Sequence, residues 1–148
     1  MEWKIKKFND LTNIELYEIL RLRSEVFILE QNCNYQDLDR KDYDSYHLFQ
    51  INENNEFTAY LRILPKGISY NEVSIGRVLT KPSNRKNKSG RMMIETAINF
   101  IEKQLGETEI RISAQKYLIK FYESFGFKIT SDEYLEDNIP HVEMFYNK

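Results

Sequence analysis

The sequence predicts an α+β protein in which helices cover a mixed β-sheet, and three patterns lead to this fold class. Residues 2–8 alternate apolar with polar side chains, as half-buried strands do. Two amphipathic helices, one opening at Thr12 and one ending before Gly106, each lie between predicted strands. Because strands alternate with helices along the chain, we expect some strands to be parallel and the helices to cover the sheet.

The composition narrows the classes of protein. At 148 residues the chain has the length of one domain, so we expect a single domain over residues 1–148. A net charge of −2 gives no general attraction to nucleic acid or membrane, and no apolar run approaches membrane-spanning length. The N-terminus lacks a signal-peptide pattern, and the single cysteine, Cys33, excludes an internal disulfide framework or a cysteine-based zinc site. We therefore expect a cytoplasmic protein with no metal site and no nucleic-acid or membrane partner.

The first helix has a well-defined start. Thr12 is the predicted N-cap and Glu15 completes a capping box, while Leu11 and Leu16 form a hydrophobic staple. The apolar residues at helical spacing are Leu16, Ile19, Leu20, Val26 and Phe27. Residues 30–46 follow without a clear period, and we expect a loop with one short helical turn there.

The middle and the end of the chain supply the remaining elements. Residues 47–51 and 57–64 form a predicted hairpin, and residues 72–80 form another strand, in which Gly76 marks a bulge or a close backbone approach. The second long helix ends at Gly106 and buries Met93, Ile94, Ala97, Ile98, Ile101 and Leu105. A short strand at 110–114, a short helix ending at Gly126 and a final strand pair at 128–134 and 141–146 complete the prediction.

The most informative segment lies between the strand at 72–80 and the second helix. After Pro82 the turn is rich in small residues and carries four cations, namely Arg85, Lys86, Lys88 and Arg91. A helix N-terminus directs backbone N–H groups at whatever lies in front of it. This combination suits a pyrophosphate, and it indicates a nucleotide-bearing cosubstrate rather than a protein partner.

With the elements in this order, nearly the whole chain resembles the GNAT superfamily of acyl-CoA-dependent N-acyltransferases. In that family a strand and a proline precede an Arg/Gln-x-x-Gly-x-Gly/Ala signature, and here Pro82, Arg85 and Gly90 match it. Lys88 takes the place of the central glycine, and we expect it to keep the charge complementarity only if its φ is negative.

Two further matches support the resemblance. The family's Tyr-x-x-x-Gly-Phe segment is present from Tyr122 to Phe127, and Gln115 stands where asparagine is common. Residues 23–31, 35–39 and 139–141 resemble the ElaA-type branch of the superfamily. The resemblance implies the GNAT fold, a mixed central sheet of about six to seven strands with about four flanking helices, splayed between the fourth and fifth strands.

The resemblance also implies a reaction and a set of contacts. An amine would attack an acyl-CoA thioester directly in a ternary complex, and the acyl donor is acetyl-CoA by family default. The amide of Leu79 would polarise the thioester oxygen. The residues implied to contact the cosubstrate are Val78, Leu79, Thr80, Arg85, Lys86, Asn87, Lys88, Ser89, Gly90, Arg91 and Gln115.

Tyr122 is the implied general acid for the departing thiolate, because a phenol can donate a proton while its ring packs in an apolar site. The identity of the general base stays open: it is a glutamate, a histidine or a water molecule. The candidate side chains are Glu30, His47 and His141, together with Glu72 at the start of the fourth strand.

The acceptor is expected to be a small-molecule or peptide amine bound within residues 23–47. Glu30, Asp37 and Asp39 would attract its charge, and Tyr35 would stack on it. Two alternatives stay open: an acyl-homoserine-lactone-synthase-like enzyme, which the spacing of Arg23 and Phe27 also fits, and a non-catalytic acyl-CoA-binding regulatory module. Dimers are frequent in the superfamily, so a homodimer is a further expectation.

Overall fold

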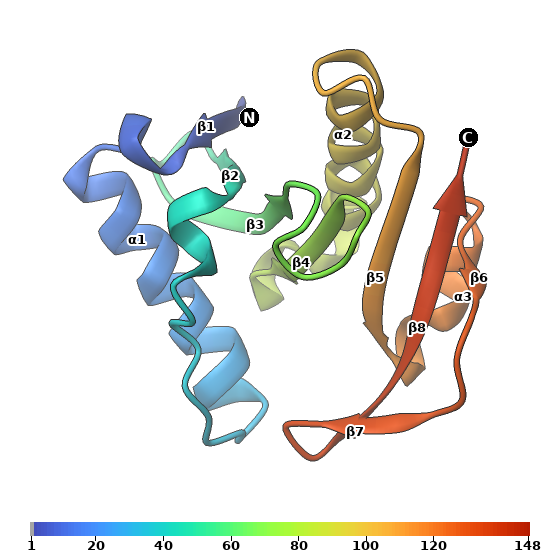
Figure 1. Cartoon of the computed structure of the whole chain (residues 1–148). Helices are drawn as coiled ribbons and strands as arrows, with labels where there is room; N and C mark the ends of the chain where they lie inside the picture. Colours follow the sequence, from blue (N-terminus) through green and yellow to red (C-terminus); the bar gives the residue numbers. More distant parts are fainter. Residues whose placement is uncertain (1) are drawn as a thin grey trace.

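The computed structural model describes residues 2–148, except for the side chain of Asn87, and it contains two antiparallel sheets that touch at one end (Figure 1). The strands of the first sheet, in spatial order, are β1 (Glu2–Lys7), β2 (Tyr46–Ile51), β3 (Phe57–Leu64) and β4 (Ser74–Thr80). The second sheet is centred on β8 (Ile139–Asn147), whose partners are β5 (Glu109–Gln115), β6 (Lys128–Ile129) and β7 (Tyr134–Glu136).

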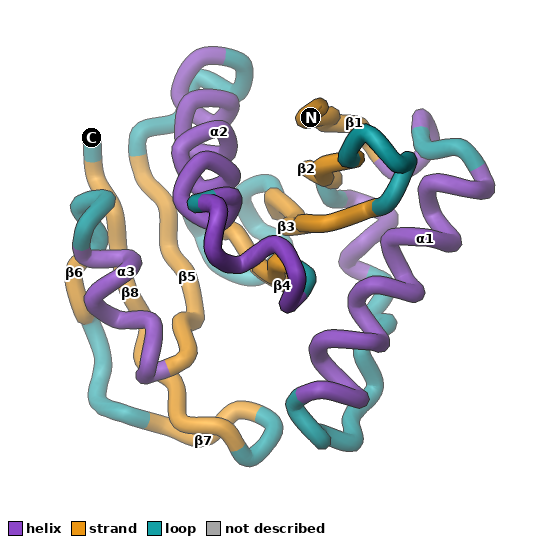
Figure 2. Tube along the Cα trace, turned by 180° about the vertical axis from the view of Figure 1, so that it is seen from behind, coloured by secondary structure: helices purple, strands orange, loops and turns teal. Residues whose placement is uncertain are grey.

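Three α-helices in the described residues pack on these sheets, and Figure 2 shows them from behind. They are α1 (Asn13–Arg23), α2 (Ser89–Lys103) and α3 (Ile119–Glu123). Successive strand residues point to opposite faces. Leu48 of β2 therefore joins the core that contains Met93 of α2, whereas the next residue, Phe49, joins the core under Ile19 of α1. The first sheet is thus covered on both faces.

The predicted start of α1 is confirmed. The hydroxyl of Thr12 accepts a hydrogen bond from the backbone N–H of Glu15 at 3.0 Å. The Glu15 carboxylate accepts one in return from the N–H of Thr12 at 2.9 Å, which completes the capping box. Beyond Arg23 the helix continues as a π-helix over Ser24–Glu30, which the sequence pattern does not distinguish from an α-helix.

Two other expectations need correction. Within residues 2–148, parallel pairing consists of one bridge, between Val73 and Ile110. The chain crosses from the first sheet to the second through α2, and the two sheets separate directly beyond this bridge. The strand expected at 128–134 is divided into β6 and β7. Pairing stops near Ser131, whose hydroxyl accepts the N–H of Glu143 at 2.8 Å in place of a backbone carbonyl.

The four 3-10 helices in the described residues are short and lie at Phe8–Asp10, Lys41–Asp44, Pro82–Asn87 and Lys116–Leu118. The helix at Lys41–Asp44 confirms the short helical turn expected within residues 30–46. None of the helices in residues 2–148 has the length and apolar character needed to span a bilayer.

Candidate active site

The site is organised by the joint between the two sheets. Val73 accepts a hydrogen bond from the backbone N–H of Arg111 at 2.9 Å, and the Arg111 side chain makes two 3.0 Å bonds to the carboxylate of Glu72. Beyond this joint β4 and β5 diverge (Figure 1). Glu72 therefore holds the joint closed, and its use by Arg111 argues against the role of general base that the sequence allowed.

The predicted irregularity of β4 is a bulge, and it lies next to Gly76. Tyr60 is opposite Leu79 and Arg62 is opposite Gly76, so β4 carries one more residue than β3 between these pairs. Arg77 in the bulge has φ +52°, a left-handed conformation that costs a non-glycine residue about 1 kcal/mol. The bulge turns Arg77 and Val78 toward the opening between the sheets, where both line a pocket.

The backbone of β4 offers hydrogen-bonding groups at its open edge. The N–H of Lys81 bonds to Thr58 of β3 at 2.8 Å, and the register continues through Ala59–Thr80 to Tyr60–Leu79. Since an antiparallel strand alternates its N–H groups between its two edges, the amide of Leu79 faces β3. Val78 lies in the bulge and lines the opening. The Leu79 amide, expected to polarise the thioester, is thus used within the sheet, and the Leu79 side chain is buried in the core under α1.

The backbone of the basic turn is left-handed at its last residue, Lys88. Lys88 has φ +63°, which is left-handed, so the condition of a negative φ is not met and Lys88 adopts the conformation usual for glycine. Helix α2 begins at Ser89, and the backbone N–H of Met92 donates to the carbonyl of Lys88 at 3.1 Å. The amides of Gly90 and Arg91 precede this bond and lie at the positive end of the helix dipole.

The cations of the turn differ in their partners. Arg85 makes a bidentate ion pair with Glu30, at 2.5 and 2.7 Å, and this hydrogen bond lowers the pKa of Glu30. Arg91 bonds to Ser124 at 2.9 Å and lies 4.5 Å over the ring of Phe125. Lys86 and Lys88 are exposed. Because Glu30 is ionised and engaged by Arg85 outside the pocket, it is a poor candidate for the general base.

A buried polar network holds the turn against the first sheet. The side-chain amide of Asn84 donates to the hydroxyl of Ser89 at 2.9 Å and to Gln50 at 3.1 Å. Thr58 of β3 donates to the same Gln50 oxygen at 3.0 Å. Ser89 is 1% exposed, so its side chain fixes the turn, and a bound pyrophosphate would meet the backbone there.

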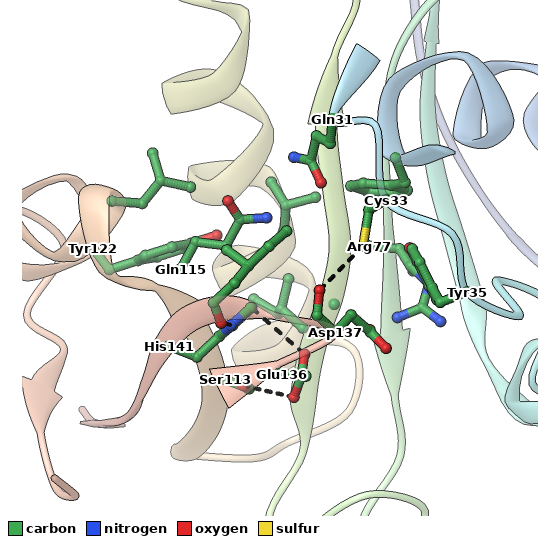
Figure 3. Close-up of a pocket in the computed structure, with 16 residues that line it drawn as sticks. Gln31, Cys33, Tyr35, Arg77, Ser113, Gln115, Tyr122, Glu136, Asp137 and His141 are labelled. Carbon is green, nitrogen blue, oxygen red and sulfur yellow. Dashed lines mark hydrogen bonds and ion pairs between the residues drawn. The ribbon is translucent and has the colours of Figure 1, made fainter. Parts of the chain in front are cut away.

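A pocket opens where the sheets diverge, and Figure 3 shows its lining. It is bounded by the bulge of β4, the end of β5, α3, the β7–β8 hairpin and the segment after the π-helix. The volume of this cavity is about 90 Å³, which suits a slender ligand. Three of the predicted site residues line this pocket besides Val78: Gln115, Tyr122 and His141.

Tyr122 lies on α3 with its hydroxyl end directed into the pocket (Figure 3). Its ring packs edge-on against Phe121 and Phe127, at centroid distances of 5.2 and 5.8 Å, and the residue is 5% exposed. Burial raises the pKa of its hydroxyl, so the phenol stays protonated at neutral pH. The arrangement has the properties of a proton donor held in an apolar surrounding.

His141 lies on β8 directly opposite Gln115 of β5, and both side chains reach the same pocket. Its Nδ1 is 2.6 Å from the carbonyl of Ile139, and only an N–H can make that contact. The neutral ring therefore carries its proton on Nδ1 and has its lone pair on Nε2. Nε2 lies 3.5 Å from a carboxylate oxygen of Glu136. This fixed tautomer makes His141 the best placed of the predicted bases.

His47, by contrast, lies outside the pocket. It is fully buried, with Nδ1 2.7 Å from the Tyr60 hydroxyl and Nε2 2.9 Å from the carbonyl of Asp42. Burial lowers the pKa of His47, so the ring is kept neutral. Both nitrogens are used in packing β2 against the neighbouring loop, and the proposed role of His47 as the base is not supported.

The acidic segment expected to bind the acceptor is neutralised internally. Asp37 accepts from Arg23 at 2.9 Å and from Arg77 at 2.7 Å, and Asp39 accepts from Arg62 at 2.6 and 2.8 Å. Burial alone would raise the pKa of Asp39, but Arg62 holds it well below its usual range. Tyr35 does line the pocket, although its hydroxyl bonds to Asp37 and Arg77 lies over its ring. The sequence pattern reveals the charges here but not their pairing.

Sequence reasoning missed the acids that border the pocket, Glu136 and Asp137 (Figure 3). Asp137 and Asn138 have φ values of 50° and 66° and join β7 to β8 as a two-residue hairpin loop. An Asp-Asn pair between two strands is a recognisable signal for such a loop. Cys33 donates to the backbone carbonyl of Asp137 at 3.1 Å and so ties the loop to the segment after the π-helix.

Among residues 2–148, no three His, Cys, Asp or Glu side chains are grouped as metal ligands would be.

Comparisons with known proteins agree with this geometry. Residues 15–148 match the model of the acetyltransferase (GNAT) domain. A UPF0039 protein of Schizosaccharomyces pombe is 41% identical over 145 residues, which cover 97% of this chain and 95% of the relative. ElaA of Escherichia coli is 36% identical, and its crystal structure has a TM-score of 0.91 with 99% of this chain and 100% of that chain covered.

An acyl-CoA N-acyltransferase from Pseudomonas aeruginosa has the same TM-score of 0.91 and the same 36% identity, with 99% of each chain covered. At 14% identity, an aminoglycoside 6′-N-acetyltransferase solved with coenzyme A shares the fold alone, with a TM-score of 0.73 over 97% of this chain and 96% of that one. These neighbours confirm the expected GNAT fold. The chain therefore belongs to the GNAT acetyltransferase family, with ElaA and the UPF0039 proteins as its homologues.

Proposed function

We propose that this protein transfers an acetyl group from acetyl-CoA to a primary amine by direct attack in a ternary complex. One observation carries the proposal: the pocket between the diverging sheets brings together the open edge of β4, the Tyr122 hydroxyl and the Nε2 of His141. Membership in the GNAT family and the acyltransferase name of the P. aeruginosa neighbour support the reaction class. The lone cysteine supports a reducing, cytoplasmic location.

The residues of β4 and of the turn after it fit the acyl donor. The amides of Gly90 and Arg91 at the N-terminus of α2 would hold the pyrophosphate, with Arg85 and Lys86 supplying charge. The open edge of β4 would pair with the amide-bearing arm of coenzyme A as an added strand does. The amide of Val78 would then donate to the thioester oxygen. The coenzyme A bound by the aminoglycoside 6′-N-acetyltransferase supports this assignment.

The acceptor must lose a proton before its nitrogen can attack. An ammonium in the pocket would give one proton to Nε2 of His141, whose tautomer is fixed by Ile139. The neutral nitrogen then forms a bond to the thioester carbon, and the oxyanion is stabilised by the Val78 amide. The imidazolium that results lies beside the Glu136 carboxylate, which favours its charge.

Collapse of the intermediate breaks the carbon–sulfur bond. The thiolate takes the proton of the Tyr122 hydroxyl, and the surplus proton of the new amide nitrogen restores that hydroxyl through water. The balance is one ammonium and one thioester consumed, with one amide, one thiol and one proton formed. Tyr122 therefore has a role in turnover and none in holding the nucleotide.

The experiment that tests the proposal measures acetyl-CoA binding by calorimetry and release of free thiol with a panel of primary amines. Tyr122→Phe should bind acetyl-CoA unchanged and lose about 10²-fold in kcat. Tyr17→Phe, at a position 70% exposed on α1, is the matched control and should keep full activity. Failure of well-folded protein to take up acetyl-CoA overturns the proposal, and uptake without thiol release from any amine indicates a binding module instead.

A further inference from the structure

We infer that the acceptor is a slender amine with a second positive charge and no carboxylate beside its reacting nitrogen, and that Glu136 and Asp137 recognise it. The inference rests on the proposed N-acyltransferase function and names the substrate class for that site. It follows from the charges on the two walls of the pocket, from the 3.5 Å separation of His141 Nε2 and the Glu136 carboxylate, and from the position of the β7–β8 hairpin loop.

The charged side chains at the wall formed by the first sheet are paired with one another and carry no net charge. Arg77, which lines the pocket, donates to the Asp37 carboxylate at 2.7 Å and to its backbone carbonyl at 3.0 Å. The ion-paired network to which Arg77 belongs contains three cations and three anions, namely Arg23, Arg62, Arg77, Asp37, Asp39 and Asp42. An acceptor carboxylate therefore finds no free cation on this wall.

On the opposite wall, two hydrogen-bond acceptors, one on His141 and one on Glu136, face each other. His141 is 6% exposed, and the only hydrogen bond of its ring within the described residues is made by Nδ1. Its Nε2 lone pair lies 3.5 Å from an oxygen of Glu136. The other Glu136 oxygen accepts from the Ser113 hydroxyl at 3.1 Å. Two acceptors at this separation are satisfied by a positively charged N–H, either on the imidazole itself or on a bound ammonium.

Asp137 provides a second anionic position further along the same loop. Within residues 2–148 its carboxylate takes part in no ion pair, and it borders both the central pocket and the adjoining groove lined by Gln31–Asn34. The bond from Cys33 to its backbone carbonyl fixes the loop at this position. A chain with one ammonium at His141 and Glu136 would thus extend a second one toward Asp137.

The same charges discriminate against carboxylates. An α-amino acid would place its carboxylate beside the reacting nitrogen, close to Glu136 and with no free cation to pair with. Such a like-charge juxtaposition weakens binding as effectively as a missing contact does. Together these features favour an alkyl diamine over an amino acid.

The experiment compares 1,5-diaminopentane with L-lysine, which differ only by the carboxylate. We expect kcat/KM for thiol release to be at least tenfold higher with the diamine. Glu136→Gln should raise KM for the diamine about tenfold and leave KM for acetyl-CoA unchanged, because the neutral amide still fills the space but no longer attracts the ammonium. Glu53→Gln, in the distant β2–β3 turn, is the matched control and should change neither constant.

A second measurement separates this inference from the proposed function. Binding of each amine to the protein saturated with coenzyme A is followed by calorimetry, which needs no turnover. Tighter binding of the diamine, lost in Glu136→Gln, supports the inference even if no thiol release is detected. Equal use or equal binding of the two amines overturns it, and so does a Glu136→Gln variant that handles the diamine as the native protein does.

Discussion

The two walls of the pocket differ in how their charged side chains are partnered. Behind the wall of the first sheet, Arg23 of α1 is fully buried and is shared between Asp37 and Asp42 at 2.9 and 2.8 Å. On the wall of the second sheet, Glu136 is about half exposed and contacts His141 only at 3.5 Å. A buried charge without a partner is very costly, so the first wall must be paired. The second wall lies near water and keeps its acceptors available.

The difference separates structural charges from chemical ones. The buried network ties the loop after the π-helix to β3 and to the bulge of β4, and so fixes the shape of the pocket. The acceptors of the β7–β8 hairpin contribute little to that framework. We therefore expect substitutions on the first wall to change stability and substitutions on the second wall to change turnover.

The substitution Arg23→Met should have the largest effect, and it tests whether the buried network stabilises the fold. It leaves Asp37 and Asp42 buried with one cationic partner fewer, so the free energy of unfolding should fall by about 3–5 kcal/mol. Denaturant titration followed by circular dichroism measures the change. Arg111→Met removes the same charge from a pair of which 23% of the arginine side chain is exposed, and should cost about 1 kcal/mol or less. Similar losses in both variants would contradict the assigned difference.

The same network predicts sensitivity to acid. Burial alone would raise the pKa of Asp42, but the hydrogen bond and charge of Arg23 hold it below its usual range. A carboxylate whose pKa is lowered by folding stabilises the protein above its ordinary pKa, and the stability is lost as the pH falls through the folded value. The free energy of unfolding should thus decline below about pH 4, and the decline should be shallower in Arg23→Met.

On the other wall, His141→Gln should preserve the fold and lower kcat/KM by about 10²-fold, because the proposed proton acceptor is lost. His47→Gln is the matched control, since His47 bonds Tyr60 and the Asp42 carbonyl instead. That variant should lose about 1–2 kcal/mol of stability while its folded fraction keeps its kcat/KM. A reversal of these two outcomes would exchange the roles of the histidines.

The contrast also explains how far the sequence could predict this protein. Local signals are strong, so the capping box at Thr12 and Glu15, the β2–β3 hairpin and the turn before α2 were all predicted. Which acids meet which arginines is a long-range property, because Asp39 and Arg62 are 23 residues apart and the spacing of neither reveals the other. The two histidines both begin strand patterns, and only the packing of those strands separates the buried one from the one in the pocket.

Lys88→Gly tests the backbone of the pyrophosphate turn. Relief of the left-handed strain at φ +63° should outweigh the added freedom of the unfolded chain and raise the free energy of unfolding by about 0.5–1 kcal/mol. Lys86→Gly removes the same charge within the 3-10 helix Pro82–Asn87, where φ is not positive, and should have the opposite sign. Thermal unfolding of the two variants side by side measures the difference, and a destabilised Lys88→Gly would show that the strain is absent.

Glu30→Gln is expected to have the smallest effect and sharpens the distinction between buried and exposed pairs. Glu30 and Arg85 are paired, yet 38% and 42% of their side chains are exposed, so Arg85 should be able to leave Glu30 for another anion at little cost. If Arg85 gives up this carboxylate to hold a pyrophosphate, the variant should bind acetyl-CoA about two- to fivefold more tightly at low salt, and the gain should shrink as salt is added. Calorimetry at two ionic strengths measures it, with Glu133→Gln, paired to Lys116 on the surface, as the control. Weaker binding in Glu30→Gln would show that the carboxylate helps to hold the turn in its binding conformation, and the pair would then belong with the structural charges of the first wall.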